Sequence, residues 1–443
     1  MYIKTMSLPN GVDYASQKHD SLVVDSALIE LQPMNGRTFN MQSHIILEFP
    51  NRPFSFYDTE SAVLSMTVTN NDGHKVTFDS TLACLIQRMS ITNAGAVLSD
   101  CVDYNKVHHF LLDYGMSREE RATRLALTSG NKVPEDQLKV TYQDAAGVIA
   151  GLTAGAAITK GSAREGQELA ASGGSKNFST NLYGSIWSAN KYIPAALASP
   201  LTVNLYLDAA KQAFLCADTA ILDSEIVITD VKLQIQSVKL EPSVYQAVSA
   251  NGFQFMCEDF ATSRSTLEQT STDHTVTLPF RYSKLKSYFA LFQKQADLTA
   301  FDKKSVTSRV SMADVTANSD LKWKEFYLSV AGTKYPAMSI QDFNRFPKLL
   351  EGFDLSLGDE HQISISKDEA EGEASAIGMS LEAVRNKSDL MSGMNTTQST
   401  VVPVYSFTAG RHGDVGVVAI THIGVFDSLI QLDPLTGVLV LST

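Results

Sequence analysis

Histidines are the residues in this chain most able to bind a metal or move a proton, and nine are scattered over its 443 residues. His108 and His109 are adjacent. Neighbouring helix positions point about 100° apart, so both cannot ligate one ion, and a helix would place one against the core and one in water. His412, His422 and Asp414 approach the ligand set of a metal-dependent cupin-type enzyme, but they lack a third histidine and a glutamate. We interpret them as loop and strand residues.

Other patterns that carry chemistry are weak or missing from the sequence. Residues 367–373 (KDEAEGE) could attract Ca²⁺ but do not have the spacing of an EF-hand, and a solvated loop fits them better. The sequence contains no phosphate-binding glycine loop, no G-x-G-x-x-G and no nucleophile elbow. We therefore expect no enzyme, no metal site and no cofactor. A sandwich hydrolase with dispersed carboxylates is the alternative within the enzyme class.

One order of elements occurs twice along the chain. Residues 88–115 predict a strand, a tight turn, a second strand and a helix, and residues 325–353 repeat this order. The copies are 237 residues apart at the turn (331 minus 94) and 239 at the helix (342 minus 103), so the second carries a two-residue insertion. An aspartate, an aromatic residue, an asparagine and a cation begin both helices. We interpret this repeat as a duplicated β-domain; the alternative is two unrelated hairpin–helix connections.

The residues that the repeat singles out are predicted to shape turns and helix ends, not to bind or react. Each copy has an alanine and a glycine at its turn and an aspartate and an asparagine at its helix start: Ala94, Gly95, Asp103, Asn105, Ala331, Gly332, Asp342 and Asn344. Glycine supplies the positive φ that a tight hairpin needs. The aspartate is expected to cap the helix by accepting hydrogen bonds from the amides of its first turn.

Composition limits the classes of partner. The net charge is −12 and the first twenty residues contain only Lys4 and Lys18 as cations, so no basic arm is available to hold nucleic acid. Four widely spaced cysteines without a CxxC pair fit a reducing cytoplasm. No secretory signal is expected at the start of the sequence. The longest uncharged apolar stretch, residues 145–159, is too short to span a bilayer, so we expect a soluble chain.

Hydrophobic residues alternate with a period near two through most of the chain, which predicts half-buried strands. The run 224–240 changes its apolar phase from Ile226 and Ile228 to Val231, Leu233 and Ile235 and back to Val238 and Leu240, and such changes mark bulges. About eight short strands in each half predict two tandem β-sandwiches. The predicted boundaries are 1–241 for the first domain, 242–252 for a helical linker and 253–443 for the second domain.

Three segments interrupt this pattern. Residues 144–176 and 367–400 are rich in small residues and are predicted to be insertion loops, the second with a short helix near residues 380–387. The apolar half of the first insertion could instead touch a membrane or a neighbouring subunit. Residues 283–295 are predicted to form a helix whose apolar face contains Leu285, Tyr288, Phe289 and Phe292.

The order of these parts resembles the double jelly-roll major capsid proteins of tailless membrane-containing phages, adenoviruses and polinton-like viruses. The resemblance rests on TLACLIQRMSITNAGAVLSDCVDYNKVHHFLLD, on LTVNLYLDAAKQAF followed by SEIVITDVKLQIQSVKLEPSVYQAV, and on the strand before DFNRFPKLLEGF. These segments occur in order over most of the chain. None is a strict motif, and the two predicted insertions match nothing specific in the family.

The resemblance implies an all-β chain of two tandem eight-stranded jelly-roll sandwiches with short helices and long loop insertions. Its implied function is that of a virion shell subunit, whose homotrimers form pseudo-hexameric capsomers of an icosahedral capsid. Implied partners are copies of itself, penton and minor capsid proteins and an internal membrane, with synthesis in the host cytoplasm and no sequence-specific nucleic-acid binding. The competing interpretation is a non-viral tandem carbohydrate-binding module.

Overall fold

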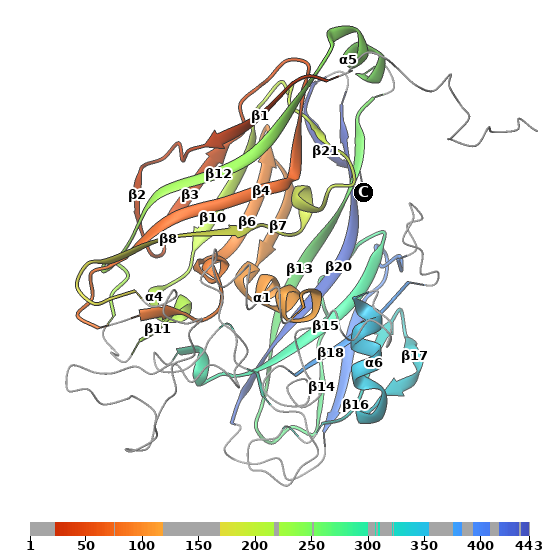
Figure 1. Ribbon diagram of the computed structural model, residues 1–443. Coiled ribbons are helices and arrows are strands. Elements are labelled where there is room, and N and C mark those ends of the chain that lie inside the picture. Colours follow the sequence, from red (N-terminus) through yellow and green to blue (C-terminus); the bar gives the residue numbers. More distant parts are fainter. Residues whose placement is uncertain are drawn as a thin grey trace, which may run out of the picture.

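A computed structural model shows the chain as two β-sandwiches joined side by side (Figure 1). The structure describes residues 23–74, 76–117, 169–216, 221–249, 252–299, 306, 309–310, 321, 323–353, 375–382, 393–407, 416–433 and 436–442. Among these residues β-strands dominate, and the strands pair antiparallel throughout.

The first sandwich is a jelly roll made of two sheets, whose four principal strands have the orders β1-β12-β4-β8 and β3-β10-β6-β7. The strands of the first sheet are β1 (Val23–Leu31), β12 (Ile226–Leu240), β4 (Ser55–Asn70) and β8 (Gly174–Asn181). Those of the second are β3 (His44–Glu48), β10 (Leu201–Leu207), β6 (Ile86–Asn93) and β7 (Ala96–Val102). The smaller strands are β2 (Thr38–Asn40) on β12, β9 (Ile193–Pro194) on β4, and the pair β5 (Val76–Phe78) and β11 (Phe214–Cys216).

The second sandwich repeats the same strand order in the remaining sequence, with the sheets β13-β20-β15-β18 and β14-β19-β16-β17. Its first sheet contains β13 (Gln254–Leu267), β20 (Val418–Leu432), β15 (Leu285–Lys294) and β18 (Ala376–Ser380). Its second contains β14 (Asp273–Thr275), β19 (Val401–Phe407), β16 (Trp323–Val330) and β17 (Thr333–Ile340), and β21 (Leu439–Ser442) adds to β20. If the eight principal strands of each half are numbered in chain order, one sheet has the order 1-8-3-6 and the other has the order 2-7-4-5. This holds for both halves.

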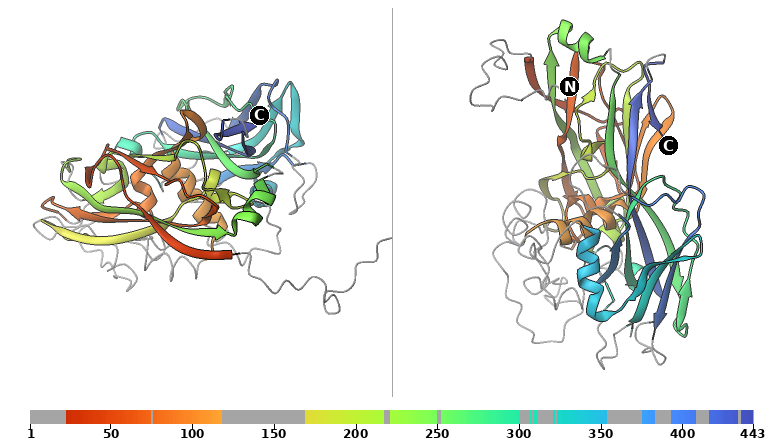
Figure 2. Two further views of the ribbon diagram at one scale, coloured as in Figure 1. Left: turned by 90° about the horizontal axis from the view of Figure 1, so that it is seen from above. Right: turned by 90° about the vertical axis from the view of Figure 1, so that its right-hand side faces the viewer.

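Short helices occupy equivalent connections in the two jelly rolls (Figure 2). Helix α1 (Tyr104–Gly115) follows β7, and α6 (Asp342–Gly352) follows β17. Helix α5 (Pro242–Ser249) lies between β12 and β13, where the sheet membership of the chain changes. The remaining helical turns are α4 (Ala210–Ala213), η2 (Leu82–Leu85), η6 (Ser185–Ser188) and η7 (Asp297–Thr299).

The repeated hairpin has the same backbone in both copies. Ala94 and Gly95 have φ of 51° and 84°, and Ala331 and Gly332 have φ of 49° and 80°. Positive φ at both central positions of a two-residue hairpin defines a type I′ turn, whose twist matches that of the strands. Alanine is strained there and glycine is not, so the shared Ala-Gly pair is a specific feature of the two copies.

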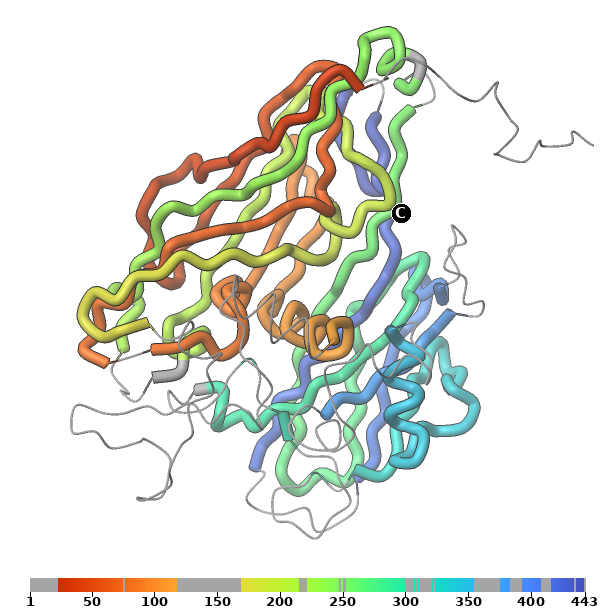
Figure 3. The backbone as a smooth tube through the Cα atoms, in the orientation of Figure 1, coloured from red at the N-terminus to blue at the C-terminus, as the bar shows by residue number. Residues whose placement is uncertain are grey.

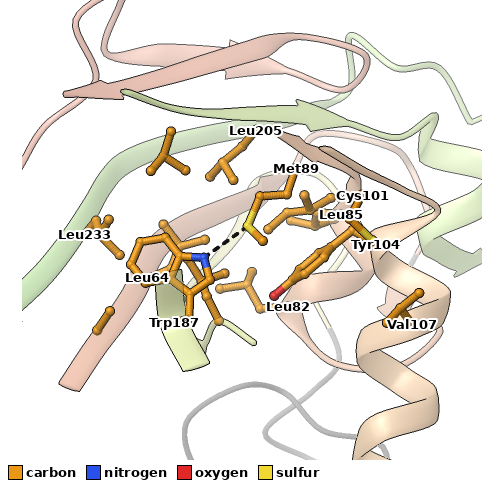
Figure 4. Close-up of a cluster of buried hydrophobic side chains, with 14 of the residues drawn as sticks. Leu64, Leu82, Leu85, Met89, Cys101, Tyr104, Val107, Trp187, Leu205 and Leu233 are labelled. Atoms are coloured by element: carbon orange, nitrogen blue, oxygen red, sulfur yellow. Dashed lines mark hydrogen bonds between the residues drawn. The ribbon is translucent and has the colours of Figure 1, made fainter. Parts of the chain in front are cut away.

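Alternation of apolar and polar residues produces the core. Strand β10, for example, lies between β3 and β6 in its sheet, and every second residue of β10 is buried. Figure 4 shows how residues from both sheets and α1 meet in the first jelly roll, where Trp187 Nε1 donates to Met89 Sδ at 3.4 Å. The apolar cluster of the first jelly roll continues without a break into Phe255, Cys257 and Phe260 of β13. Figure 3 shows that β13 and β20 extend from the second jelly roll along the side of the first.

The helix predicted over 283–295 is wrong, because this segment forms strand β15. The periodicity was misleading because the strand is buried on both faces: Tyr288 and Phe292 belong to the core of the second jelly roll, while Phe289 packs against Phe110 of α1 and against Phe353. A strand covered on both sides has a nearly continuous apolar run, which also matches a helical spacing.

The predicted insertions are partly wrong at their ends. Residues 174–176, at the end of the first predicted insertion, begin β8, and Leu169 pairs with Val76 as an isolated bridge. Within the second, residues 376–380 form β18 beside β15. Small residues are needed in β18, because a Cβ on Gly378 would lie 2.4 Å from Phe289 Cδ1. The remainder of the first insertion, 144–168, and the helix near 380–387, except residues 380–382, lie outside the described residues.

The two phase changes predicted for β12 lie at or next to its two shifts of register against β4, although the buried row of residues changes only at the first. Asp230 has φ of 50°, and the register of β12 against β4 shifts between Thr229 and Lys232. Beyond it, burial continues through Ile235 to Ser237, so Val238 and Leu240 stay on the opposite face from this buried row. The second shift of register, between Gln234 and Gln236, is accommodated by extra residues in β4.

Phe289→Ala tests the contact of β15 with α1. The free energy of unfolding should fall by about 3–5 kcal/mol, because a large buried ring is replaced by a cavity. Leu222→Ala is the control, since Leu222 is 58% exposed, and should change stability by less than about 0.5 kcal/mol. Chemical denaturation followed by tryptophan fluorescence measures both. Equal stability of the two variants would contradict the packing described.

Candidate assembly site at the junction of the two jelly rolls

Strand β13 is an edge strand of its sheet, and residues of the first jelly roll cover this edge. The amide of Asn190 donates to the carbonyl of Met256 at 3.0 Å, and the amide of Met256 donates to Asn190 Oδ1 at 2.9 Å. Ser188 Oγ accepts from the amide of Glu258 at 3.0 Å and donates to its carbonyl at 2.7 Å. The backbone of the edge is thereby satisfied across the junction instead of being left open for pairing.

A charged pair crosses the same junction further along β13. Asp103, at the start of α1, accepts from Arg264 Nε at 2.6 Å and also from Arg264 Nη2. The Asp103 side chain is 2% exposed and that of Arg264 is 52% exposed. Beside this pair, Thr262 Oγ1 donates to the carbonyl of Val102 at 2.6 Å. A bidentate pair with one buried partner fixes the orientation of the two sandwiches.

The capping role predicted for Asp103 is wrong. Asp103 occupies the N-cap position, but its φ of 57° is left-handed, and its side chain makes no capping hydrogen bond. Side-chain capping requires an extended N-cap residue, so the carboxylate is left to bind Arg264. Asn105 instead bonds locally and across the fold: its Oδ1 accepts from the amide of Lys106 at 2.9 Å, and its Nδ2 donates to Asp208 Oδ2 at 2.8 Å.

The predicted cap Asp342 is also wrong, for a different reason. Helix α6 begins one residue earlier than expected relative to α1, so Gln341 is the N-cap and Asp342 is the first helical residue. Asn344 Oδ1 accepts from the amide of Gln341 at 2.7 Å, which satisfies that end of the chain. The Asp342 side chain is 59% exposed, and its carboxylate lies 3.9 Å from Arg345 Nε. The two copies of the repeat therefore use the same residue types in different contacts.

Buried charges surround the junction. Burial lowers the pKa of Lys106 to about 8, while the nearby Asp103 carboxylate opposes this change. Burial raises the pKa of Asp208 to about 6, against the hydrogen bonds from Ala209 and Asn105. Asp259 of β13 is buried as well, and burial raises its pKa to about 7. In each of the three groups burial favours the uncharged form.

A second polar network lies inside the second jelly roll. Ser265 Oγ is 2.7 Å from His422 Nε2 and 3.0 Å from His274 Nε2, and His422 Nδ1 is 2.6 Å from the hydroxyl of Tyr288. The Tyr288 hydroxyl also meets that of Tyr405 at 2.5 Å. Burial lowers the pKa of His422 to about 3, so its ring is neutral. Tyr288 and His422 come from one sheet of this jelly roll and Tyr405 from the other, so the network connects the two sheets through fully buried side chains.

The adjacent histidines His108 and His109 lie in α1. Both His108 and His109 are buried, so the expectation that one faces water is wrong: α1 is covered on both flanks. His108 Nε2 is 3.1 Å from the carbonyl of Asn181, while His109 lies 2.8 Å from Ser80 Oγ. His412, Asp414 and the acidic segment 367–373 lie outside the described residues. Within the described part of the chain, no group of three His, Cys, Asp or Glu residues could hold a metal ion.

Sequence reasoning missed Arg264, Asp208, Asp259 and the cover of β13 by residues 188–190. Each contact joins residues 66 to 161 positions apart, and no local pattern marks such partners. Helices long and apolar enough to cross a membrane are not found among the described residues.

Comparison with known proteins identifies the fold. No protein-family model matches the chain, and no curated protein matches it in sequence. Among solved structures, the PBCV-1 virus capsid superposes with a TM-score of 0.62 at 9% identity, covering 96% of this chain and 98% of that chain. The faustovirus major capsid protein gives 0.61 at 8% identity, covering 94% and 92%. The mavirus major capsid protein gives 0.52 at 11% identity, covering 100% and 96%.

The chain therefore has the double jelly-roll fold of these viral major capsid proteins, over nearly its whole length. This agrees with the fold expected from the sequence: two tandem eight-stranded jelly rolls in an all-β chain.

Asp103→Asn tests the pair with Arg264. Asparagine tolerates the left-handed backbone, so the variant removes the charge and keeps the turn. The free energy of unfolding should fall by about 1–3 kcal/mol. This loss is smaller than that for a fully buried ion pair, because half of the Arg264 side chain is exposed to solvent. Arg264→Gln and the double variant complete a thermodynamic cycle, in which the losses should not add. Arg88→Gln, which breaks the exposed pair with Asp100, should cost less than about 0.5 kcal/mol. Additive losses for Asp103 and Arg264 would contradict the pair.

Asp259→Asn tests the buried carboxyl. Burial raises the pKa of Asp259 from 3.8 to about 7 in the folded chain. Between these two pH values the folded chain keeps the proton while the unfolded chain releases it. The free energy of unfolding therefore has its full value below about pH 4 and falls as the pH rises to about 7. Asparagine stays neutral. The variant should match the native chain at pH 4 and exceed its free energy of unfolding at pH 8 by on the order of 3 kcal/mol. Denaturation across pH 4–8 measures this difference, and a difference that does not change with pH would refute it.

Proposed function

We propose that this chain is the major capsid protein of an icosahedral virus and acts through burial of surface between subunits, not through turnover. The observation that supports this most directly is the tandem pair of jelly rolls with identical strand order, held in one orientation by the β13 junction. Three such chains supply six similar sandwiches. A ring of six can then close by a repeated head-to-tail contact, which gives a homotrimeric, pseudo-hexameric capsomer.

The domain organisation supports the same assembly. We propose 1–241 as the first domain, 242–252 as the linker and 253–443 as the second domain, related by duplication. In both jelly rolls the Ala-Gly turn joins the fourth and fifth principal strands, and the helix lies between the fifth and the sixth. Ala94, Gly95, Ala331 and Gly332 shape the turns of this repeat, and Asp103, Asn105, Asp342 and Asn344 are its helix-start positions.

Charge indicates which partners the shell subunit meets. A net charge of −12 gives the chain no broad electrostatic attraction for nucleic acid. We propose that minor capsid proteins or an internal membrane stand between shell and genome, that penton proteins fill the fivefold positions, and that the subunit is made in the host cytoplasm and resides in the virion. The comparisons give no support to the carbohydrate-binding alternative.

Light scattering of the purified chain, with negative-stain images of the same peak, tests the proposal. The expected mass is three times 48.2 kDa, or 144.6 kDa, with a hexagonal outline. A chain that stays monomeric over a wide range of concentration and salt, and that binds glycans on an array, would contradict the capsid function.

A further inference from the structure

An apolar groove of about 690 Å³ lies at the end of the molecule that contains α5 (Figure 1). Its walls come from both jelly rolls and from the helix that links them: the start of β1, the end of β12, helix α5 and the start of β13. Lys191 is the one charged side chain among the described residues that line it. A concave surface with so little charge fits apolar side chains better than an ionic ligand.

The groove accounts for apolar residues that the core of the first jelly roll does not use. Val238 and Leu240 lie on the face of β12 opposite to its buried row, and both line the groove. Helix α5 adds Val244 and Val248, which are four positions apart and therefore lie on one face of the helix. Val248 is 40% exposed, so the described part of the chain leaves this wall open to solvent.

Aromatic packing holds helix α5 against both jelly rolls. The ring of Tyr245 lies 5.6 Å from that of Phe54 and 5.4 Å from that of Phe56, both in the first jelly roll. It also lies 5.7 Å from the ring of Phe253, which directly precedes β13. Phe56 and Phe253 contact each other at 5.5 Å. Such ring pairs fix the position of the helix, so a ligand in the groove contacts a formed wall that joins the two jelly rolls.

The described chain begins at this groove. Val23, its first residue, lines the groove and is 43% exposed. Residues 1–22 precede it, and within them residues 1–8 (MYIKTMSL) contain five large apolar residues and a single charged side chain. The fourteen residues 9–22 (22 minus 8) separate this apolar run from Val23. Fourteen residues can span about 45–50 Å when extended, which is enough for the run to fold back onto the groove.

We propose that residues 1–8 bind in the groove of their own chain, between α5 and the ends of β1, β12 and β13, and thereby hold the linker helix to both jelly rolls. The covalent link favours this occupant over a free partner, because a short tether keeps a segment at an effective concentration on the order of 1 mM. Burial of the apolar run against the apolar wall supplies the driving force. This contact within one chain does not depend on the proposed capsid function.

Photo-crosslinking locates the segment directly. Tyr2 is replaced in the full chain by the photoreactive residue p-benzoylphenylalanine, and the crosslinks are mapped by mass spectrometry after irradiation. The expected crosslinks join this position to the lining residues of α5 and β12, in a product that keeps the mass of one chain on a denaturing gel. Val248→Asp should lower the yield of these crosslinks by at least about tenfold, because an unpaired charge is costly in an apolar site.

Two further variants complete the design. Ile3→Asp changes the segment and none of the residues that form the groove, so it should lower the yield as much as Val248→Asp does. Leu222→Asp is the matched control, since Leu222 is 58% exposed and does not line the groove, and it should leave the yield unchanged. Melting of each variant shows whether it folds.

The outcomes distinguish the possible occupants. Crosslinks that map outside the groove overturn the proposal. Crosslinks in the groove that join two chains, and so double the mass on the gel, also overturn it, because the segment of a second copy is then the occupant. Crosslinks that keep their full yield in both Val248→Asp and Ile3→Asp overturn the apolar contact. The trimer measurement that tests the proposed function is separate from all of these results, so the two proposals fail independently.

Discussion

An edge strand leaves one row of backbone amides and carbonyls without partners, and this constraint governs the molecule. A jelly roll built from two four-stranded sheets has such edges at every sheet end. At β13 the chain resolves the problem internally, since residues 188–190 of the first jelly roll bond the backbone of Met256 and Glu258. The junction, the orientation of the two sandwiches and the continuous core follow from the need to cover this edge.

The polar groups of the junction supply geometry more than net stability. Asp103, Asp208 and Asp259 are all buried, and a buried carboxyl is costly unless it is paired or protonated. Asp103 has Arg264, Asp208 has the Asn105 amide, and Asp259 keeps its proton to a higher pH. The apolar contact of Phe255, Cys257 and Phe260 with the first core drives the association, and the charges decide the register in which it forms.

Local patterns in the sequence were sufficient for the fold and insufficient for the junction. The Ala-Gly turns, the helix after each hairpin and α5 follow from short-range rules on positive φ, apolar period and proline, so they could be predicted. Strand β15 could not, because burial on both faces removes the alternation that marks a strand. The role of Asp103 could not either: its backbone conformation is imposed by a hairpin exit, and its partner Arg264 is 161 residues away.

The central claim is that one chain supplies two adjacent members of a six-sandwich ring. Cryo-electron microscopy of the purified oligomer, at a resolution that separates β-strands, tests it most directly. The account predicts a ring of six sandwiches in which each chain contributes two neighbours. A particle without this six-membered ring, or one in which the two sandwiches of a chain are not neighbours, would contradict it.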